Sequence, residues 1–227
     1  MFWQDEEETQ LPKVTDEVVD LAFAIKGREL PCDHAWLLME AIRAVLPWFG
    51  DDPAHGLHLV NPAPSGNGWY SPTDMEEERM YLPRRTKLML RLPKAATDAA
   101  RELEGAVLDV GGSSLAVGEG EIRLLSLHTT LNARHVIGGD PRAGEAEFLE
   151  WAHEQLERLG VQAKRMVVGR TTVLKREHDQ LVTRSLMLAD LKPDESLEVQ
   201  RSGLGAERRM GCGIFVPHKS VRNILGE

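Results

Sequence analysis

Cysteine and long apolar runs are both scarce in this chain of 227 residues, and each absence excludes a class of protein. The two cysteines, Cys32 and Cys212, supply neither a disulfide framework nor four thiolate ligands for a structural metal. No apolar run approaches the roughly 20 residues that a membrane helix requires. The first residues, MFWQDEEE, have no basic segment before an apolar stretch, so we expect no secretory signal. The composition therefore predicts a cytoplasmic protein with reduced thiols, no membrane partner, no metal and no cofactor.

Positive charge is also in short supply. Lysine and arginine number 27 against 36 acidic residues, and the net charge of −9 excludes a protein that coats nucleic acid over its whole surface. A protein of this kind can still bind nucleic acid through one local basic surface. Each basic pair can equally be a solvated strand end or turn. The basic clusters are Arg84, Arg85 and Lys87; Lys164 and Arg165; Lys175 and Arg176; and Arg208 and Arg209.

Glycine, in contrast, is concentrated near the C-terminus, in the segment Gly203-Leu-Gly-Ala-Glu-Arg-Arg-Met-Gly-Cys-Gly213. Two Gly-x-Gly pairs bracket two arginines. Glycine lets backbone N–H groups approach a bulky anion, and arginine adds a forked donor that suits phosphate. We expect this glycine loop to hold an anion, although the same glycines can serve only as turn residues. The residues exclude a Walker motif, because Cys212-Gly213-Ile214 stands where Lys-Ser/Thr is needed, and Ile214–Val216 resembles a strand where a dinucleotide fingerprint opens a helix.

Periodicity predicts an α+β fold made of two tandem ferredoxin-like (RRM-like) βαββαβ domains. We expect a flexible acidic tail over residues 1–15, one domain over 16–112, and a second over 113–227 that contains the glycine loop. In the first domain the expected strands are 18–25, 56–60, 86–92 and 106–110, with helices over 33–47 and 93–103. In the second they are 122–136, 163–173, 181–188 and 213–217, with helices over 145–159 and 193–202.

This order of elements, with a glycine-rich loop before the last strand, resembles the RAMP superfamily of CRISPR-associated proteins. The segment from Gly203 to Lys219 is similar to the family's signature loop, and Val19-Asp-Leu-Ala-Phe-Ala-Ile-Lys-Gly-Arg-Glu-Leu-Pro-Cys-Asp-His34 is similar to the entry to its first helix. The resemblance covers about residues 17–219. It is strongest to the endoribonucleases, in a short single-chain variant, that cut CRISPR repeat transcripts into guide RNAs.

The resemblance implies metal-independent RNA cleavage. In such enzymes the ribose 2′-hydroxyl attacks the neighbouring phosphate and leaves a 2′,3′-cyclic phosphate and a 5′-hydroxyl. A histidine suits the proton transfers, because its pKa lies near neutrality. His34, at the first turn of the first helix, is the main catalytic candidate, with Tyr70 and Arg84 as a hydroxyl and a cation beside the phosphate. The expected RNA contacts are Arg85, Lys87, Lys164, Arg165, Arg170, Lys175, Arg176, Gly203, Gly205, Arg208, Arg209, Gly211 and Gly213.

Other readings stay open. Among the remaining histidines, His128 and His135 lie on the expected first strand of the second domain and could face RNA. A RAMP subunit that binds guide RNA in an effector complex with other CRISPR-associated proteins, without cutting it, would have the same fold and the same loop. A two-domain interaction module, in which the glycine loop is only a turn, is the alternative outside the family. The expected partner in the first two readings is CRISPR repeat RNA.

Overall fold

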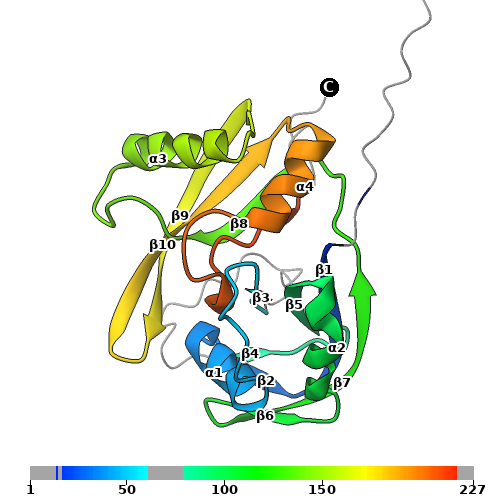
Figure 1. The fold of residues 1–227 in the computed structure, drawn as a ribbon. Helices are drawn as coiled ribbons and strands as arrows, with labels where there is room; N and C mark the ends of the chain where they lie inside the picture. Colours follow the sequence, from blue (N-terminus) through cyan, green and yellow to red (C-terminus); the bar gives the residue numbers. More distant parts are fainter. Residues whose placement is uncertain (1–13, 15–16, 61–78, 219–227) are drawn as a thin grey trace, which may run out of the picture.

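The computed structural model describes residues 14, 17–60 and 79–218. The expected acidic tail lies almost entirely outside this part of the chain, and so does Tyr70. Within the described residues the chain forms two sheets, each covered on one face by helices (Figure 1).

The N-terminal sheet is antiparallel, and its strands run in the order β3-β5-β1-β7-β6. Its first four strands have the order 2-3-1-4, which is the ferredoxin-like arrangement. Leu21 on β1 lies opposite Leu90 on β5, and both side chains are fully buried. The bounds are β1 (Val18–Lys26), β3 (Gly56–His58), β5 (Lys87–Pro93), β6 (Val107–Val110) and β7 (Ser113–Arg123), with a small ribbon of β2 (Glu29–Pro31) and β4 (Arg79–Tyr81).

Helix α1 (Ala35–Val45) covers this sheet with one apolar face. Leu38, Met39 and Ile42 recur at helical spacing and are buried against the strands. The helix stops shortly before Pro47, whose missing N–H and fixed φ do not suit a helix interior. The second predicted helix is broken into three short pieces, namely η1 (Lys94–Ala96), α2 (Thr97–Ala100) and η2 (Arg101–Leu103).

The C-terminal sheet repeats the arrangement with the strand order β11-β8-β10-β9. This is the ferredoxin-like order 4-1-3-2, and it confirms the predicted tandem fold. Phe148 on α3 and Leu186 on β10 belong to one buried core, so the helices cover one face of the sheet and leave the other uncovered. The bounds are β8 (Leu131–Val136), β9 (Arg165–Arg176), β10 (Asp179–Ala189), β11 (Val216–Pro217), α3 (Glu145–Arg158) and α4 (Pro193–Ser202).

The boundary between the domains differs from the expected one near residue 112. Strand β7 pairs with β1 over Asp20–Arg123 to Lys26–Ala116 and therefore belongs to the N-terminal sheet. The expected strand over 122–136 is instead two strands in two sheets, β7 and β8. Strand β6, the predicted fourth strand, is an added edge strand that pairs with β7, and β7 is the fourth strand of the ferredoxin-like order. The chain passes from the N-terminal sheet to the C-terminal sheet in the segment that joins Arg123 to Leu131.

Arg91 joins the two domains from a fully buried position. Its guanidinium forms a two-pronged ion pair with Asp20, with Nε–Oδ1 2.8 Å and Nη2–Oδ2 2.9 Å. Its Nη1 donates to the carbonyls of Gln200 and Phe215 across the interface, each at 2.9 Å. His58 Nε2 lies 3.0 Å from Asp20 Oδ1. Burial alone would raise the pKa of the Asp20 carboxyl, but His58 and Arg91 hold it well below its usual range.

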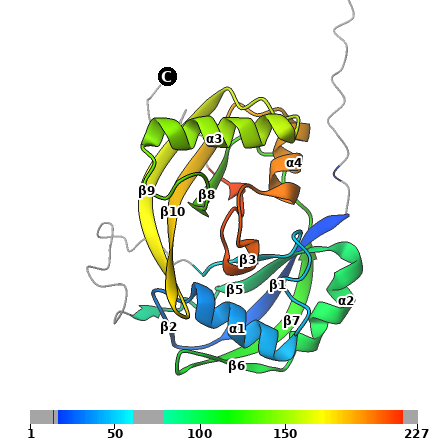
Figure 2. The ribbon, with the colours of Figure 1, turned by 60° about the vertical axis from the view of Figure 1, so that its left-hand side comes forward.

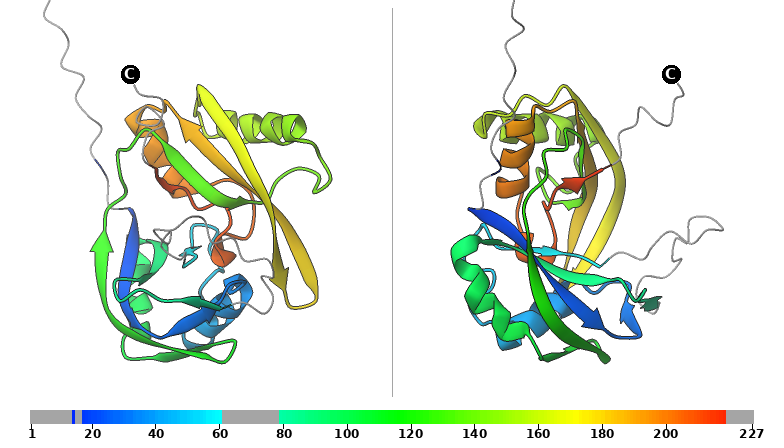
Figure 3. Two further views of the ribbon diagram at one scale, coloured as in Figure 1. Left: turned by 180° about the vertical axis from the view of Figure 1, so that it is seen from behind. Right: turned by 90° about the vertical axis from the view of Figure 1, so that its right-hand side faces the viewer.

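The β9–β10 hairpin forms a second link between the domains (Figure 2). It reaches past its own sheet to the start of α1, where the Lys175 N–H donates to Asp33 Oδ2 at 2.9 Å. Leu174 near the hairpin end is buried in the N-terminal core. Arg176 Nη1 binds Glu207 at 2.9 Å, which ties the hairpin to the glycine loop. Two further views, turned by 180° and by 90° from Figure 1, also show the hairpin beside the N-terminal domain (Figure 3).

We predict that Arg91→Met destabilises the protein by about 3–5 kcal/mol, because it leaves the buried Asp20 carboxylate unpaired. Arg142→Met is the matched control, since Arg142 pairs with Asp140 from a side chain that is 94% exposed. Urea unfolding measures both changes. An Arg91→Met protein that unfolds at the same urea concentration as the control would contradict the role of Arg91 in the interface.

Candidate functional site

The glycine loop turns inward and packs against the protein itself. Gly205 and Gly213 have φ of +79° and +66°, and a Cβ at either position would overlap a backbone carbonyl oxygen, of Ile137 and Leu204 respectively. The Gly213 N–H donates to the His135 carbonyl at 2.6 Å. The glycines therefore let the loop approach strand β8 and fold over itself. This packing requires glycine at both positions, and the binding of an anion at the loop stays a prediction.

Arg208, within the short helix η3 (Arg208–Met210), is also directed into the protein. Only 7% of its surface is exposed, and its Nη1 donates to the carbonyls of Arg201, at 2.6 Å, and Ser202. These carbonyls end α4, where a cation is favourable. Burial, with Arg91 nearby, lowers the pKa of Arg208 to about 10. Arg208 caps the end of α4 through Nη1, and its contact with phosphate stays a prediction.

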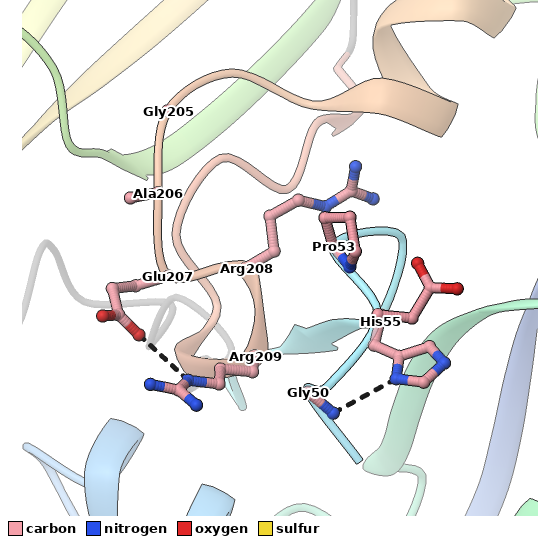
Figure 4. Close-up of a pocket in the computed structure, with 9 residues that line it drawn as sticks. Gly50, Pro53, His55, Gly205, Ala206, Glu207, Arg208 and Arg209 are labelled. Carbon is pink, nitrogen blue, oxygen red and sulfur yellow. Dashed lines mark hydrogen bonds and ion pairs between the residues drawn. The ribbon is translucent and has the colours of Figure 1, made fainter. Parts of the chain in front are cut away.

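A cavity of about 260 Å³ lies between the glycine loop and the segment after α1 (Figure 4). On one side it is lined by Gly205–Arg209, and on the other by Gly50, Asp52, Pro53 and His55. Arg209 Nε binds Glu207 at 3.1 Å, and the Gly50 N–H donates to His55 Nδ1 at 3.1 Å. Arg209 is thus paired with a protein acid, and Arg208 is bound through Nη1 alone, because its Nε and Nη2 are buried without a hydrogen-bond partner among the described residues.

His34 stands at the N-cap of α1 with only 3% of its surface exposed. Its Nδ1 lies 3.0 Å from the Pro31 carbonyl and 3.2 Å from that of Cys32, so this nitrogen carries the proton. Its Nε2 accepts the Val60 N–H at 3.1 Å. Burial lowers the pKa of the ring, against these two carbonyls, which raise it. The imidazole is thus neutral, and both of its nitrogens have protein partners.

His135 lies on β8, on the face of the C-terminal sheet that α3 and α4 do not cover. Its ring is partly exposed, and its Nδ1 lies 3.0 Å from Thr183 Oγ1 on β10. Burial, together with Arg134 and His34, lowers the pKa of His135 to about 4. From the sequence, His135 was only one of two histidines on the expected first strand of the second domain that could face RNA.

The basic candidates occupy several places. Arg84 and Arg85 are exposed in the turn before β5, and Lys87 begins that strand. Strands β3 and β5 are antiparallel, with His58 opposite Met89, so Lys87 lies at the same end of the sheet as Val60. Val60 is the residue whose N–H donates to His34 Nε2. The other candidates lie on or beside the hairpin: Lys164, Lys175 and Arg170 are exposed, Arg165 binds Asp190 at 3.1 Å, and Arg176 binds Asp179 and Glu207.

Among the described residues, no group of three or more histidine, cysteine, aspartate or glutamate side chains could hold a metal ion. No helix in that part of the chain is long and apolar enough to cross a membrane.

Comparison with known proteins assigns the family. The model of the CRISPR family Cas6 matches residues 19–220. This chain belongs to the Cas6 family. It is 33% identical over 199 residues to the CRISPR-associated endonuclease Cas6 of Myxococcus xanthus (strain DK1622), a match that covers 88% of this chain and 81% of the relative.

Solved structures agree on the fold of this Cas6 family member. A structure described as CRISPR-associated protein Cas6 has a TM-score of 0.63 at 12% identity, covering 89% of this chain and all of the other. One described as a RAMP protein that binds different RNA substrates has a TM-score of 0.57 at 11% identity, covering 88% of this chain and all of the other. At these identities the likeness shows the tandem ferredoxin-like fold.

The internal packing of the glycine loop gives a test. We predict that Gly205→Ala costs about 1–3 kcal/mol more stability than Gly105→Ala. Both residues have a positive φ, of +79° and +83°, so both substitutions carry the backbone cost of about 1–2 kcal/mol. Only Gly205 faces a carbonyl oxygen at the Cβ position, whereas Gly105 has nothing within 4 Å. Equal losses in urea unfolding would contradict the inward packing of the loop.

Proposed function

We propose that this Cas6 family protein is a metal-independent endoribonuclease that cleaves CRISPR repeat hairpins in precursor guide RNA. The proposal rests chiefly on the family match over residues 19–220 and on a curated relative that is named as an endonuclease. The reaction is attack of a ribose 2′-hydroxyl on the adjacent phosphate, which leaves a 2′,3′-cyclic phosphate and a 5′-hydroxyl.

Two histidines among the described residues have the protonation state that such a reaction requires. Transfer of a proton from the 2′-hydroxyl needs a neutral base, and His34 and His135 are neutral near pH 7 because burial lowers the pKa of each. Arg84, Arg85 and Lys87 lie toward the same end of the N-terminal sheet as Val60, the partner of His34. Their charges would position the phosphate backbone. In this proposal His34 takes part in proton transfer at the scissile bond.

One observation favours a second candidate function. Both ring nitrogens of His34 are bound by backbone groups, an arrangement that also serves a purely structural histidine. A Cas6 family protein with a structural His34 would bind guide RNA as a subunit of an effector complex without cutting it.

Incubation with the repeat hairpin RNA in EDTA separates these functions. We expect the wild-type protein to cut at one bond, and His34→Gln to cut at least about 100-fold more slowly while it binds the hairpin normally. Gln retains a donor and an acceptor for the backbone partners of His34. His153→Gln is the control, because His153 is exposed on α3 and pairs with Glu157.

The other outcomes are equally informative. Binding without cutting by the wild-type protein would support the non-catalytic subunit. Cutting by His34→Gln at the rate of the control would remove His34 from the chemistry. A wild-type protein that neither binds nor cuts the hairpin would support a general interaction module.

A further inference from the structure

The hydrogen bonds around His135 fix which of its ring nitrogens carries the proton. Thr183 Oγ1 donates its single hydrogen to the Thr172 carbonyl at 3.0 Å. The same oxygen lies 3.0 Å from His135 Nδ1, and with its hydrogen already used it can only accept there. His135 therefore carries its proton on Nδ1. In the neutral ring the lone pair then belongs to Nε2.

The Nε2 atom of His135 has no hydrogen-bond partner among residues 17–60 and 79–218. This differs from His34, which has the same tautomer but whose Nε2 is occupied by the Val60 N–H. A partly exposed imidazole with a fixed tautomer and an unoccupied lone pair has the arrangement of a general base. Its orienting hydroxyl plays the part that a carboxylate or carbonyl often plays for such a histidine.

The backbone around His135 is held from both domains. The glycine loop fixes the strand, because the Gly213 N–H donates to the His135 carbonyl at 2.6 Å. On β9, Thr172 lies three residues before Lys175, whose N–H is bound by Asp33 beside His34. The chain His135–Thr183–Thr172 thus ends close to the contact that docks the hairpin on α1. His135 therefore lies at the junction of the two domains, and its position does not depend on a motif within one domain.

We propose that His135 is the general base that activates the 2′-hydroxyl in the cleavage reaction, with Thr183 as the residue that orients it. This inference rests on the proposed function. The 2′-hydroxyl proton passes to His135 Nε2, the 2′-oxygen forms a bond to phosphorus, and the bond from phosphorus to the 5′-oxygen breaks. The departing 5′-oxygen takes a proton from water in a transfer that His34 assists, and His135 later returns its proton to the solvent.

His135→Asn is the decisive variant, because the Asn amide N–H can replace Nδ1–H as donor to Thr183 but supplies no basic nitrogen. Under single-turnover conditions with the repeat hairpin, we expect cleavage at least about 100-fold slower than wild type, with hairpin affinity and melting temperature preserved. Thr183→Val should slow cleavage by about tenfold, and Thr183→Ser should restore it, because only Ser keeps the accepting hydroxyl. His153→Asn, on the exposed side of α3, is the matched control.

The results distinguish this inference from the proposed function. If wild type and His153→Asn cut and His135→Asn cuts within about threefold of them, His135 is not the base. If the wild-type protein itself binds the hairpin without cutting it, the proposed function fails and the assignment of His135 with it. If Thr183→Ser cuts as slowly as Thr183→Val, the orienting role of the Thr183 hydroxyl is wrong.

Discussion

The two domains depend on one buried cation. Arg91 pairs with Asp20 inside its own sheet and donates across the interface to carbonyls at the end of α4 and before β11. A buried ion pair of this kind contributes little net stability, but breaking it costs several kcal/mol. Asp20 and Arg91 alternate with the core residues Leu21 and Leu90, so they lie on the sheet face opposite α1. The interface is therefore built on the uncovered face of the N-terminal sheet, and it fixes how the second sheet is presented.

That placement determines what the histidines can do. With the domains joined, the β9–β10 hairpin reaches the start of α1, where Asp33, the residue before His34, binds its backbone. The glycine loop supports the same junction from within, through Gly213 on the His135 carbonyl and Arg208 on the end of α4. The loop's glycines and Arg208 thus serve the geometry of the interface, and Arg208 has little surface with which to meet RNA.

Periodicity was sufficient for most of the fold, because the strands and α1 carry clear apolar patterns and are bounded by proline or glycine. It failed at β6 and β7, because both segments have the pattern expected of the fourth strand. Only the pairing of β7 with β1 shows which of them occupies that position in the sheet. The basic clusters could be found in the sequence, but the sequence does not show which of them are paired with acids. Arg176, for example, binds Glu207, which lies on another element. Neither the Arg91–Asp20 pair nor the His135–Thr183 contact leaves a local signal, because each joins residues at least 48 positions apart.

We propose that the joined domains place neutral histidines for attack by a ribose 2′-hydroxyl. The most direct measurement compares an all-ribose repeat hairpin with one that carries a single 2′-deoxy nucleotide before the scissile phosphate, both in EDTA. We predict that the two RNAs bind equally and that only the all-ribose hairpin is cut, to a 2′,3′-cyclic phosphate. Cleavage of the deoxy-substituted hairpin at the same bond would contradict it.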